Sequence, residues 1–206
     1  MAKSRKDMTH RRIVETAAAC FRRRGLSGIG IADLMKEAGL THGGFYAHFA
    51  SKEALVVEAL RLASERFRHL IEEAAAATAE GEKLAAVAAR YLTSRHREHP
   101  ETGCSIATLG PELGRDSGAA RQQFSANIEA AFERMAECSA AADAQARRCE
   151  ATGTYAAMVG GLILSRGVED PDTADRILAD VRRFVQAALT RGNAPEDPRP
   201  RRAKGS

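Results

Sequence analysis

Apolar residues recur at three- and four-residue spacings along most of this chain, without the two-residue alternation of a half-buried strand. The pattern therefore predicts an all-α protein. The expected helices cover residues 9–24, 31–38, 41–49, 52–79, 82–97, 101–113, 117–138, 144–166 and 171–190. Residues 192–206 are proline-rich and charged, with almost no large apolar side chain, and predict a disordered tail.

The first three expected helices are short, and a tight glycine turn separates the second from the third, as in a helix-turn-helix. In such a unit the second helix braces the third, whose start enters the major groove of DNA. Thr41 and His42 begin the third helix, where a hydroxyl and an imidazole can reach bases or phosphates. We expect Gly43 to let the backbone approach the groove closely, and Gly44 to relieve crowding against the second helix.

Three aromatic residues follow these glycines. Phe45 and Phe49 are four residues apart and are expected to face the core. Tyr46 and His48 lie off that stripe, where a phenol and an imidazole suit phosphate oxygens. Lys52 begins the next helix, whose positive end also attracts a phosphate. For Tyr46, His48 and Lys52 the alternative is an ordinary solvent-exposed position.

The net charge of +4 is unevenly distributed. Residues 1–52 carry ten Lys/Arg against four Asp/Glu, whereas residues 53–206 carry twenty-one against twenty-three. A basic N-terminal quarter indicates a polyanionic partner, although a solvated charged surface is a common alternative. The basic residues expected to add phosphate contacts are Lys3, Arg5, Lys6, Arg11 and Arg12.

Residues 13–60, IVETAAACFRRRGLSGIGIADLMKEAGLTHGGFYAHFASKEALVVEAL, closely resemble the DNA-binding domain of TetR/AcrR-type transcriptional regulators. The resemblance implies that the third helix reads a palindromic operator and that Tyr46, His48 and Lys52 contact phosphates. Such proteins often begin the second helix with a Thr/Ser pair, whereas this chain has Ile29-Gly30. Gly30 predicts only a weak cap there.

The resemblance also implies a division of the chain. A helix-turn-helix DNA-binding domain is expected over residues 1–50, including an N-terminal arm. A larger C-terminal helical domain, expected over residues 51–191, is implied to bind a small-molecule effector and to form a homodimer through its last two helices.

The residues of the last two helices point to dimerisation independently. Residues 152–167, TGTYAAMVGGLILSRG, carry small residues at spacings that allow close helix packing. One monomer would struggle to cover both apolar stripes, so a four-helix interface is expected. The candidate interface residues are Ala156, Gly160, Leu164, Val181, Phe184 and Val185. Burial within the monomer's own core is the alternative for each of them.

A cysteine in the segment TGCSIATLGPEL offers candidate sensing chemistry. The segment resembles a GC-x-x-x-x-L stretch of some TetR-like regulators, in which a nearby cysteine senses electrophiles or oxidants. Cys104 is expected in the first turn of a helix, where the dipole favours the thiolate. The alternative is a small packed residue, as most free cysteines are. His96, Glu98 and His99 form no obvious ligand set, so we expect surface histidines and no metal.

Apolar placement alone suggests which residues line an effector pocket. Together with Cys104, the candidates are Phe67, Leu70, Tyr91, Leu109, Phe124, Ile128, Tyr155 and Met158. This composition suits an apolar or aromatic small molecule.

The expected function is a cytoplasmic, nucleoid-associated regulator. Its expected partners are a double-stranded DNA operator, a small-molecule effector and a second copy of the chain. We expect a repressor, and an activator or a constitutive architectural DNA binder is the alternative. No phosphate loop, nucleophile elbow or paired-carboxylate site is found, which disfavours a small helical enzyme. No cofactor and no membrane span are expected.

Overall fold

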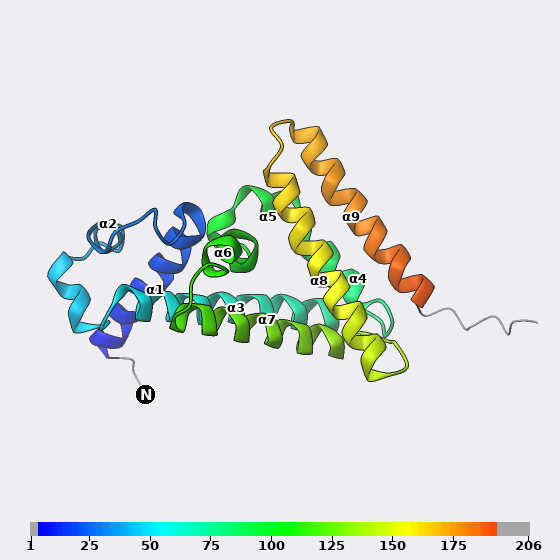
Figure 1. Ribbon diagram of the computed structural model, residues 1–206, viewed down its shortest axis with the longest axis horizontal. Coiled ribbons are helices and arrows are strands. Elements are labelled where there is room, and N and C mark those ends of the chain that lie inside the picture. Colours follow the sequence, from blue (N-terminus) through cyan, green and yellow to red (C-terminus); the bar gives the residue numbers. More distant parts are fainter. Residues whose placement is uncertain (1–3, 193–206) are drawn as a thin grey trace, which may run out of the picture.

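The computed structural model describes residues 4–192, and every regular element in that range is a helix, as predicted (Figure 1). The N-terminal elements are α1 (Arg5–Arg24), α2 (Ile31–Glu37) and the 3-10 helix η1 (His42–Ala47). The others are α3 (Lys52–Ala76), α4 (Lys83–Tyr91), α5 (Ser94–Glu98), the 3-10 helix η2 (Pro100–Thr102), α6 (Ser105–Leu113), α7 (Ala119–Glu137), α8 (Ala144–Arg166) and α9 (Pro171–Gly192). Residues 193–206 of the predicted tail lie outside the described range.

The first helix begins four residues earlier than its apolar stripe predicts. Ser4 and Asp7 form a capping box, in which each side chain accepts a hydrogen bond from the other residue's backbone N–H. Gly25 is the C-cap residue that follows α1, and its φ of 79° favours glycine. At the start of α2, Gly30 provides no side-chain cap, as its lack of a side chain predicts.

The single helix expected over residues 82–97 is instead two helices. The backbone leaves the helical conformation at Leu92, and Thr93 caps α5 by accepting a hydrogen bond from the backbone N–H of His96. The hydroxyl of Thr93 can satisfy that N–H only if the chain turns before it. This break places α5 and η2 across one end of a cavity described below.

Two groups of buried side chains form the core. The first joins α1, α2 and η1 to the start of α3 and also includes residues of α6 and α7, whereas the second fills the space among α3, α4, α7, α8 and α9. The domain boundary at residue 50 stays a prediction, and apolar packing crosses it through α3 and α6. In Figure 1, α8 and α9 form an antiparallel pair at the opposite end from α2.

Within residues 4–192, no helix combines the length and hydropathy needed to cross a membrane.

Candidate functional site

The turn that precedes α2 is held by two charged side chains. Lys52 donates from Nζ to the carbonyl oxygens of Leu26 and Ile29, each at 2.6 Å. From α6, Glu112 accepts hydrogen bonds from two backbone N–H groups of the turn, at 2.9 and 3.3 Å. Because α2 follows this turn directly, these bonds fix how α2 supports η1.

These contacts give Lys52 a different role from the one its sequence position suggests. Its ammonium folds back toward the turn and lies 5.9 Å from the centroid of the Phe21 ring. Two of its three N–H donors bond to these carbonyl groups. The carbonyl groups lie in a turn outside regular secondary structure, so they need such partners. A phosphate contact by Lys52 stays a prediction, and stabilising the turn is the function that its contacts support.

The third helix of the N-terminal unit is a 3-10 helix anchored by aromatic residues. Phe45 and Phe49 are buried, as their spacing predicts, and their ring centroids lie 5.5 Å apart. His10 of α1 stacks on Phe49 at 4.5 Å and lies 2.7 Å from a carboxylate oxygen of Glu58 in α3. These contacts attach η1 to both long helices, so its outer face is presented on a rigid support.

That outer face carries the predicted DNA-contacting residues. Thr41, His42 and Tyr46 are all exposed, and Tyr46 retains 62% of its accessible surface. The Tyr46 ring packs edge-on against Phe45 at 5.2 Å, which holds it in place without covering its hydroxyl. A fixed, exposed phenol beside a hydroxyl and an imidazole suits hydrogen bonding to nucleic acid.

The two glycines of η1 face different surroundings. A side-chain carbon built on Gly43 would meet no atom within 4 Å, whereas one built on Gly44 would lie 3.7 Å from Met35 of α2. Neither glycine has a positive φ. The free protein therefore has room for a side chain at position 43, and any requirement for glycine there comes from a partner.

His48 and the basic residues of α1 differ in how exposed they are and in whether they form ion pairs. His48 is half-buried against His10, and burial, followed by the charges of His10 and Lys6, lowers its pKa. Arg11 is paired with Glu15 at 2.8 Å, and Arg12 is exposed with no ion pair in the described part of the chain. The predicted contact by Lys3 lies outside the described residues.

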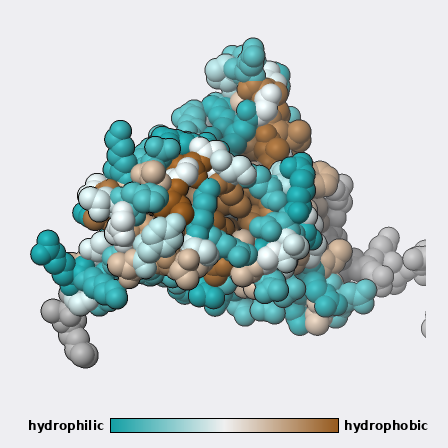
Figure 2. Space-filling model, turned by 60° about the vertical axis from the view of Figure 1, so that its left-hand side comes forward, coloured by the Kyte–Doolittle hydropathy of each residue, from teal (hydrophilic) through white to brown (hydrophobic). Residues whose placement is uncertain are grey.

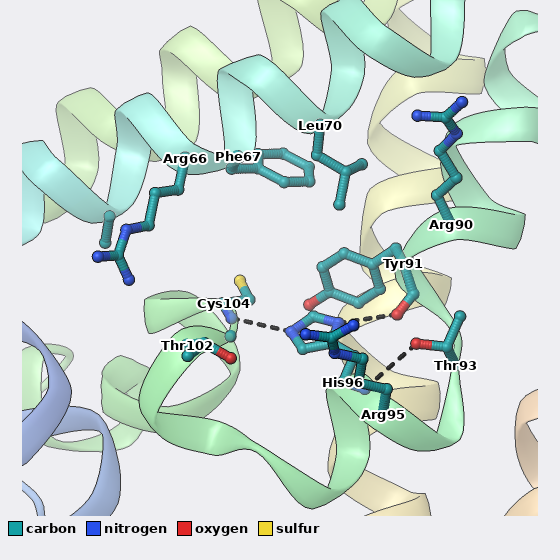
Figure 3. A pocket seen from close by; sticks show the side chains of 12 residues that line it. Arg66, Phe67, Leu70, Arg90, Tyr91, Thr93, Arg95, His96, Thr102 and Cys104 are labelled. Atoms are coloured by element: carbon teal, nitrogen blue, oxygen red, sulfur yellow. Dashed lines mark hydrogen bonds between the residues drawn. The ribbon is translucent and has the colours of Figure 1, made fainter.

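A cavity of about 220 Å³ opens among α3, α4, α5 and the start of α6 (Figure 3). Its lining residues are Ala63, Arg66, Phe67, Leu70, Arg90, Tyr91, Thr93, Arg95, His96, Thr102, Gly103 and Cys104. The structure thus brings together four of the predicted pocket residues: Phe67, Leu70, Tyr91 and Cys104.

Aromatic rings form one wall of this cavity. Phe67 stacks on Tyr155 with centroids 5.0 Å apart and meets Tyr91 edge-on at 6.0 Å. Burial raises the pKa of both phenols well above its usual value, so both remain protonated donors. The buried Tyr91 hydroxyl has no hydrogen-bond partner within residues 4–192, and in Figure 3 it points toward Cys104.

His96 and the Gly103-Cys104 pair form the floor of the cavity. Nδ1 of His96 donates to the carbonyl oxygen of Tyr91 at 2.7 Å, and Nε2 accepts from the backbone N–H of Cys104 at 2.9 Å. These two bonds require neutral imidazole, and burial lowers the pKa of His96 accordingly. A side-chain carbon on Gly103 would lie 2.7 Å from the His96 ring, so only glycine permits this approach.

This arrangement corrects one prediction. His96 is not a surface histidine but part of the cavity wall, because the helix break at Leu92 turns it inward. His99 is exposed, as expected. Among residues 4–192, no three His, Cys, Asp or Glu side chains are placed to hold a metal ion.

Cys104 is the N-cap residue of α6 rather than a member of its first turn. It is buried, and its Sγ lies 3.8 Å from the Tyr155 hydroxyl. A packing role and a sensing role both remain compatible with this position, because the residue is buried and also lines the cavity.

Five of the residues predicted to line the pocket are not among its lining residues, and one of them, Tyr155, is buried behind the lining residue Phe67, on which it stacks. Leu109, Phe124 and Ile128 belong to the core group around α1 and the start of α3. Met158 is fully buried in the second core group. Their apolar character is used for packing between helices, which the sequence pattern does not distinguish from lining a cavity.

The α8–α9 pair carries an exposed apolar surface. Figure 2 shows hydrophobic surface below the hydrophilic tip of the projecting part of the molecule, which Figure 1 identifies as α8 and α9. Leu164 and Phe184 retain 62% and 63% of their accessible surface, and Ala156 is exposed. By contrast, Val185 is buried within its own chain, so it serves the monomer. Val181 is half-buried and packs on Gly161, and its place in an interface stays a prediction.

Comparison with known proteins is informative for the N-terminal residues and for the fold as a whole. Residues 13–59 match the family model described as bacterial regulatory proteins, tetR family. Over 49 residues the chain is 47% identical to the HTH-type transcriptional repressor KstR2 of Mycobacterium tuberculosis, a match covering 24% of each protein. The chain therefore matches about a quarter of the length of this curated relative.

Solved structures extend the likeness to the whole fold. A TetR transcriptional regulator from Chloroflexus aurantiacus is 25% identical, with a TM-score of 0.73 over 88% of this chain and 96% of that one. The chain belongs to the TetR family. Another TetR-family structure, from Cytophaga hutchinsonii, has a TM-score of 0.76 at 19% identity, covering 91% and 98% of the two chains.

In this TetR-family chain, α6 connects the cavity to the helix-turn-helix. Its N-cap, Cys104, lines the cavity, and Glu112 near its other end holds the turn before α2. A second connection is made by Arg22 of α1, which donates from Nε at 2.9 Å and from Nη2 to the carbonyl oxygen of Glu101 in η2. Arg22 is 4% exposed, and burial lowers its pKa to about 10.

Sequence reasoning missed the residues that make these connections. Arg22 lies in a run of three arginines and Glu112 follows a proline, so neither has a local signal of its role. Their partners are 79 and 86 residues away in the chain. The sequence does indicate Gly103-Cys104, but the contact of this pair with His96 depends on a helix break that the periodicity does not predict.

Proposed function

We propose that this chain is a ligand-responsive transcriptional repressor that binds a palindromic operator as a homodimer. The observation that carries the proposal is the outer face of η1, where Gly43 has open space beside the fixed, exposed Tyr46. A backbone without side chains can lie against the floor of the major groove while a phenol bonds the phosphate backbone.

Dimerisation would supply the second DNA-binding unit. The exposed apolar residues Leu164 and Phe184 on the α8–α9 pair support an interface between two copies of the chain. Two units separated by about one turn of DNA, ~34–36 Å, match the two halves of a palindrome. DNA as a partner would also place the protein in the cytoplasm at the nucleoid.

The cavity supports the regulatory part of the proposal. An effector there would contact Thr102 and Cys104, from which η2 and α6 lead to Arg22 and to the turn before α2. The effector releases DNA only if it binds the non-binding arrangement of the dimer more tightly than the DNA-binding one. A constitutive DNA binder would lack this difference in affinity.

The test of DNA binding is selection of bound duplexes from a random pool, followed by gel shifts over a salt series. We expect a palindromic consensus, and we expect Tyr46→Ala to weaken binding to all sequences while Thr41→Ala and His42→Ala change sequence preference. The absence of any preferred duplex, even at low ionic strength, would contradict the proposal.

The dimer is tested separately by sedimentation. Leu164→Glu and Phe184→Glu should yield monomers that bind the operator much more weakly, because each places a charge in the proposed interface. Gln122→Glu is the matched control, since it adds the same charge to an exposed position of α7. A wild-type monomer would exclude the four-helix interface.

A further inference from the structure

The rim of the cavity is cationic and lacks a neutralising partner. Arg66 of α3 and Arg95 of α5 line it, and neither forms an ion pair with any residue in the range 4–192. No Asp or Glu is among the lining residues. Arg90 differs, because it lies 3.5 Å from Glu73 and points away from the centre of the cavity in Figure 3.

The guanidinium of Arg66 affects a second arginine. Arg22 is buried nearby, and after burial itself the charge of Arg66 is the next largest cause of the lowered pKa of Arg22. Arg22 itself does not line the cavity, but Arg66 and Arg95 are exposed at its rim, where their positive charges would attract a bound anion. In Figure 3, Arg66 extends toward the Thr102 and Cys104 side of the cavity, where such an anion would sit.

The interior adds a neutral donor and flat apolar walls. The Tyr91 hydroxyl is fully buried without a hydrogen-bond partner among residues 4–192, and a buried donor left unsatisfied is unfavourable. Figure 3 shows this hydroxyl inside the cavity below Phe67. A ligand oxygen could accept from Tyr91 while a flat body packs against the Phe67 ring.

Resting on the proposed function, we propose that the effector is a small organic carboxylate with a flat apolar body. Arg66 and Arg95 bind its carboxylate, Phe67 packs on its body, and Tyr91 donates to one of its oxygens. The sequence predicts an apolar or aromatic ligand, and this proposal adds a negative charge to that ligand. Inorganic phosphate shares the charge but not the apolar body, and the test separates the two.

The probes are benzoate, cinnamate and phenylacetate, each paired with its primary amide, together with inorganic phosphate. We expect the carboxylates to raise the Tm of the full-length protein and the amides of the same shape to have little effect, because only the charge differs. Arg66→Gln and Arg95→Gln should each weaken carboxylate binding by about tenfold in calorimetric titration. Arg148→Gln is the matched control, since it removes one positive charge from an exposed position of α8 outside the cavity.

Tyr91→Phe tests the interior separately. It should weaken carboxylate binding several-fold and leave the protein folded, because the change removes only a hydroxyl that has no hydrogen-bond partner within residues 4–192. Three results would each overturn the proposal: carboxylates and amides that bind equally well, Arg66 and Arg95 variants that bind carboxylates as tightly as the wild type does, or a Tm unchanged by every carboxylate at about 10 mM. Binding of phosphate with no preference for the carboxylates would overturn it as well.

Failure of this inference is distinguishable from failure of the proposed function. Operator binding is measured first without any probe, so a protein that binds its operator but no carboxylate contradicts only the inference. A protein that binds carboxylates but no DNA contradicts the proposed function. Carboxylate binding that leaves operator affinity unchanged contradicts the effector role.

Discussion

The outer face of η1 and the cavity beside α6 both have open space next to polar groups, but that space is bounded differently in the two regions. At η1 the open space lies beside Gly43, where no side chain is present, and the polar groups around it are exposed. In the cavity the space is lined by side chains, including a buried hydroxyl and two arginines that form no ion pair within residues 4–192. The first suits a large rigid partner that approaches the backbone, and the second suits a small molecule that satisfies polar groups.

Substitution of Gly43 should have the largest effect, and it should change only the DNA-binding face. Gly43→Ala should reduce operator affinity at least tenfold, and Gly43→Leu still more, with little change in Tm, because the side chain meets nothing until DNA is present. Gly44→Ala is the matched control, since its methyl group would face α2 at an ordinary contact distance. Gel shifts and thermal unfolding measure the two effects, and unchanged affinity in both Gly43 variants would refute close approach.

Replacing Lys52 distinguishes a residue that supports the helix-turn-helix from one that contacts DNA directly. Lys52→Ala leaves two turn carbonyls without their charged donor and should lower the free energy of unfolding by about 1–3 kcal/mol. If Lys52 instead served only as a phosphate contact, Tm would be unchanged and the salt dependence of operator binding would decrease by about one counterion. Thermal unfolding together with a salt series distinguishes these outcomes.

Glu112 tests whether the two surfaces communicate. Glu112→Ala removes the acceptor for two N–H groups of the turn before α2, so we expect operator affinity to fall several-fold. Release of DNA by an effector should become weaker, because α6 no longer holds the turn. Glu129→Ala on α7 is the control, as it removes the same charge at an exposed position. A normal effector response in the Glu112 variant would exclude α6 as the connection.

The smallest expected effect concerns the pH dependence of stability at the cavity. Burial lowers the pKa of His96 below its ordinary value of 6.5, so at acid pH the folded protein binds fewer protons than the unfolded chain. The stability due to neutral His96 is therefore present above about pH 6.5 and is lost as the pH falls toward the lower folded pKa. Half-buried Arg166, which donates to the carbonyl oxygen of His96, acts in the same direction.

Unfolding measured from pH 8 to pH 5 should show this loss in the wild type and less of it in His96→Gln. His48 has a lowered pKa too, so His48→Gln is measured in parallel to separate the two contributions. His69→Gln is the control, because that residue is exposed. An identical pH profile for wild type and His96→Gln would contradict a lowered pKa of His96.

How much could be predicted from sequence also differs between the two regions. Around η1, neighbours in the chain are neighbours in space, so the spacing of Phe45 and Phe49 was enough to predict their burial. Around the cavity, apolar character predicted Phe67 and Tyr91 but could not separate them from Leu109 and Phe124, which pack between helices. Which apolar residue faces a hollow depends on where distant helices leave a gap.

Charged residues were the hardest to predict. Lys52 was expected to face outward because its partners, two backbone carbonyls, have no residue-specific signature. Arg66 and Arg95 gave no signal because an arginine that lines a cavity and one that faces solvent occupy the same polar positions of a helix. For such residues only the three-dimensional structure reveals whether a carboxylate lies within reach.

The short length of α6 has a consequence for protein engineering. Nine residues span only about 13 Å, and each end makes its functional contact through a different residue, Cys104 at one and Glu112 at the other. If the cavity binds the proposed effector, rim residues on α3 and α5 can thus be replaced to accept another metabolite without altering the contacts that Glu112 makes. Such replacements would convert the chain into a reporter for a chosen compound with its promoter sequence retained.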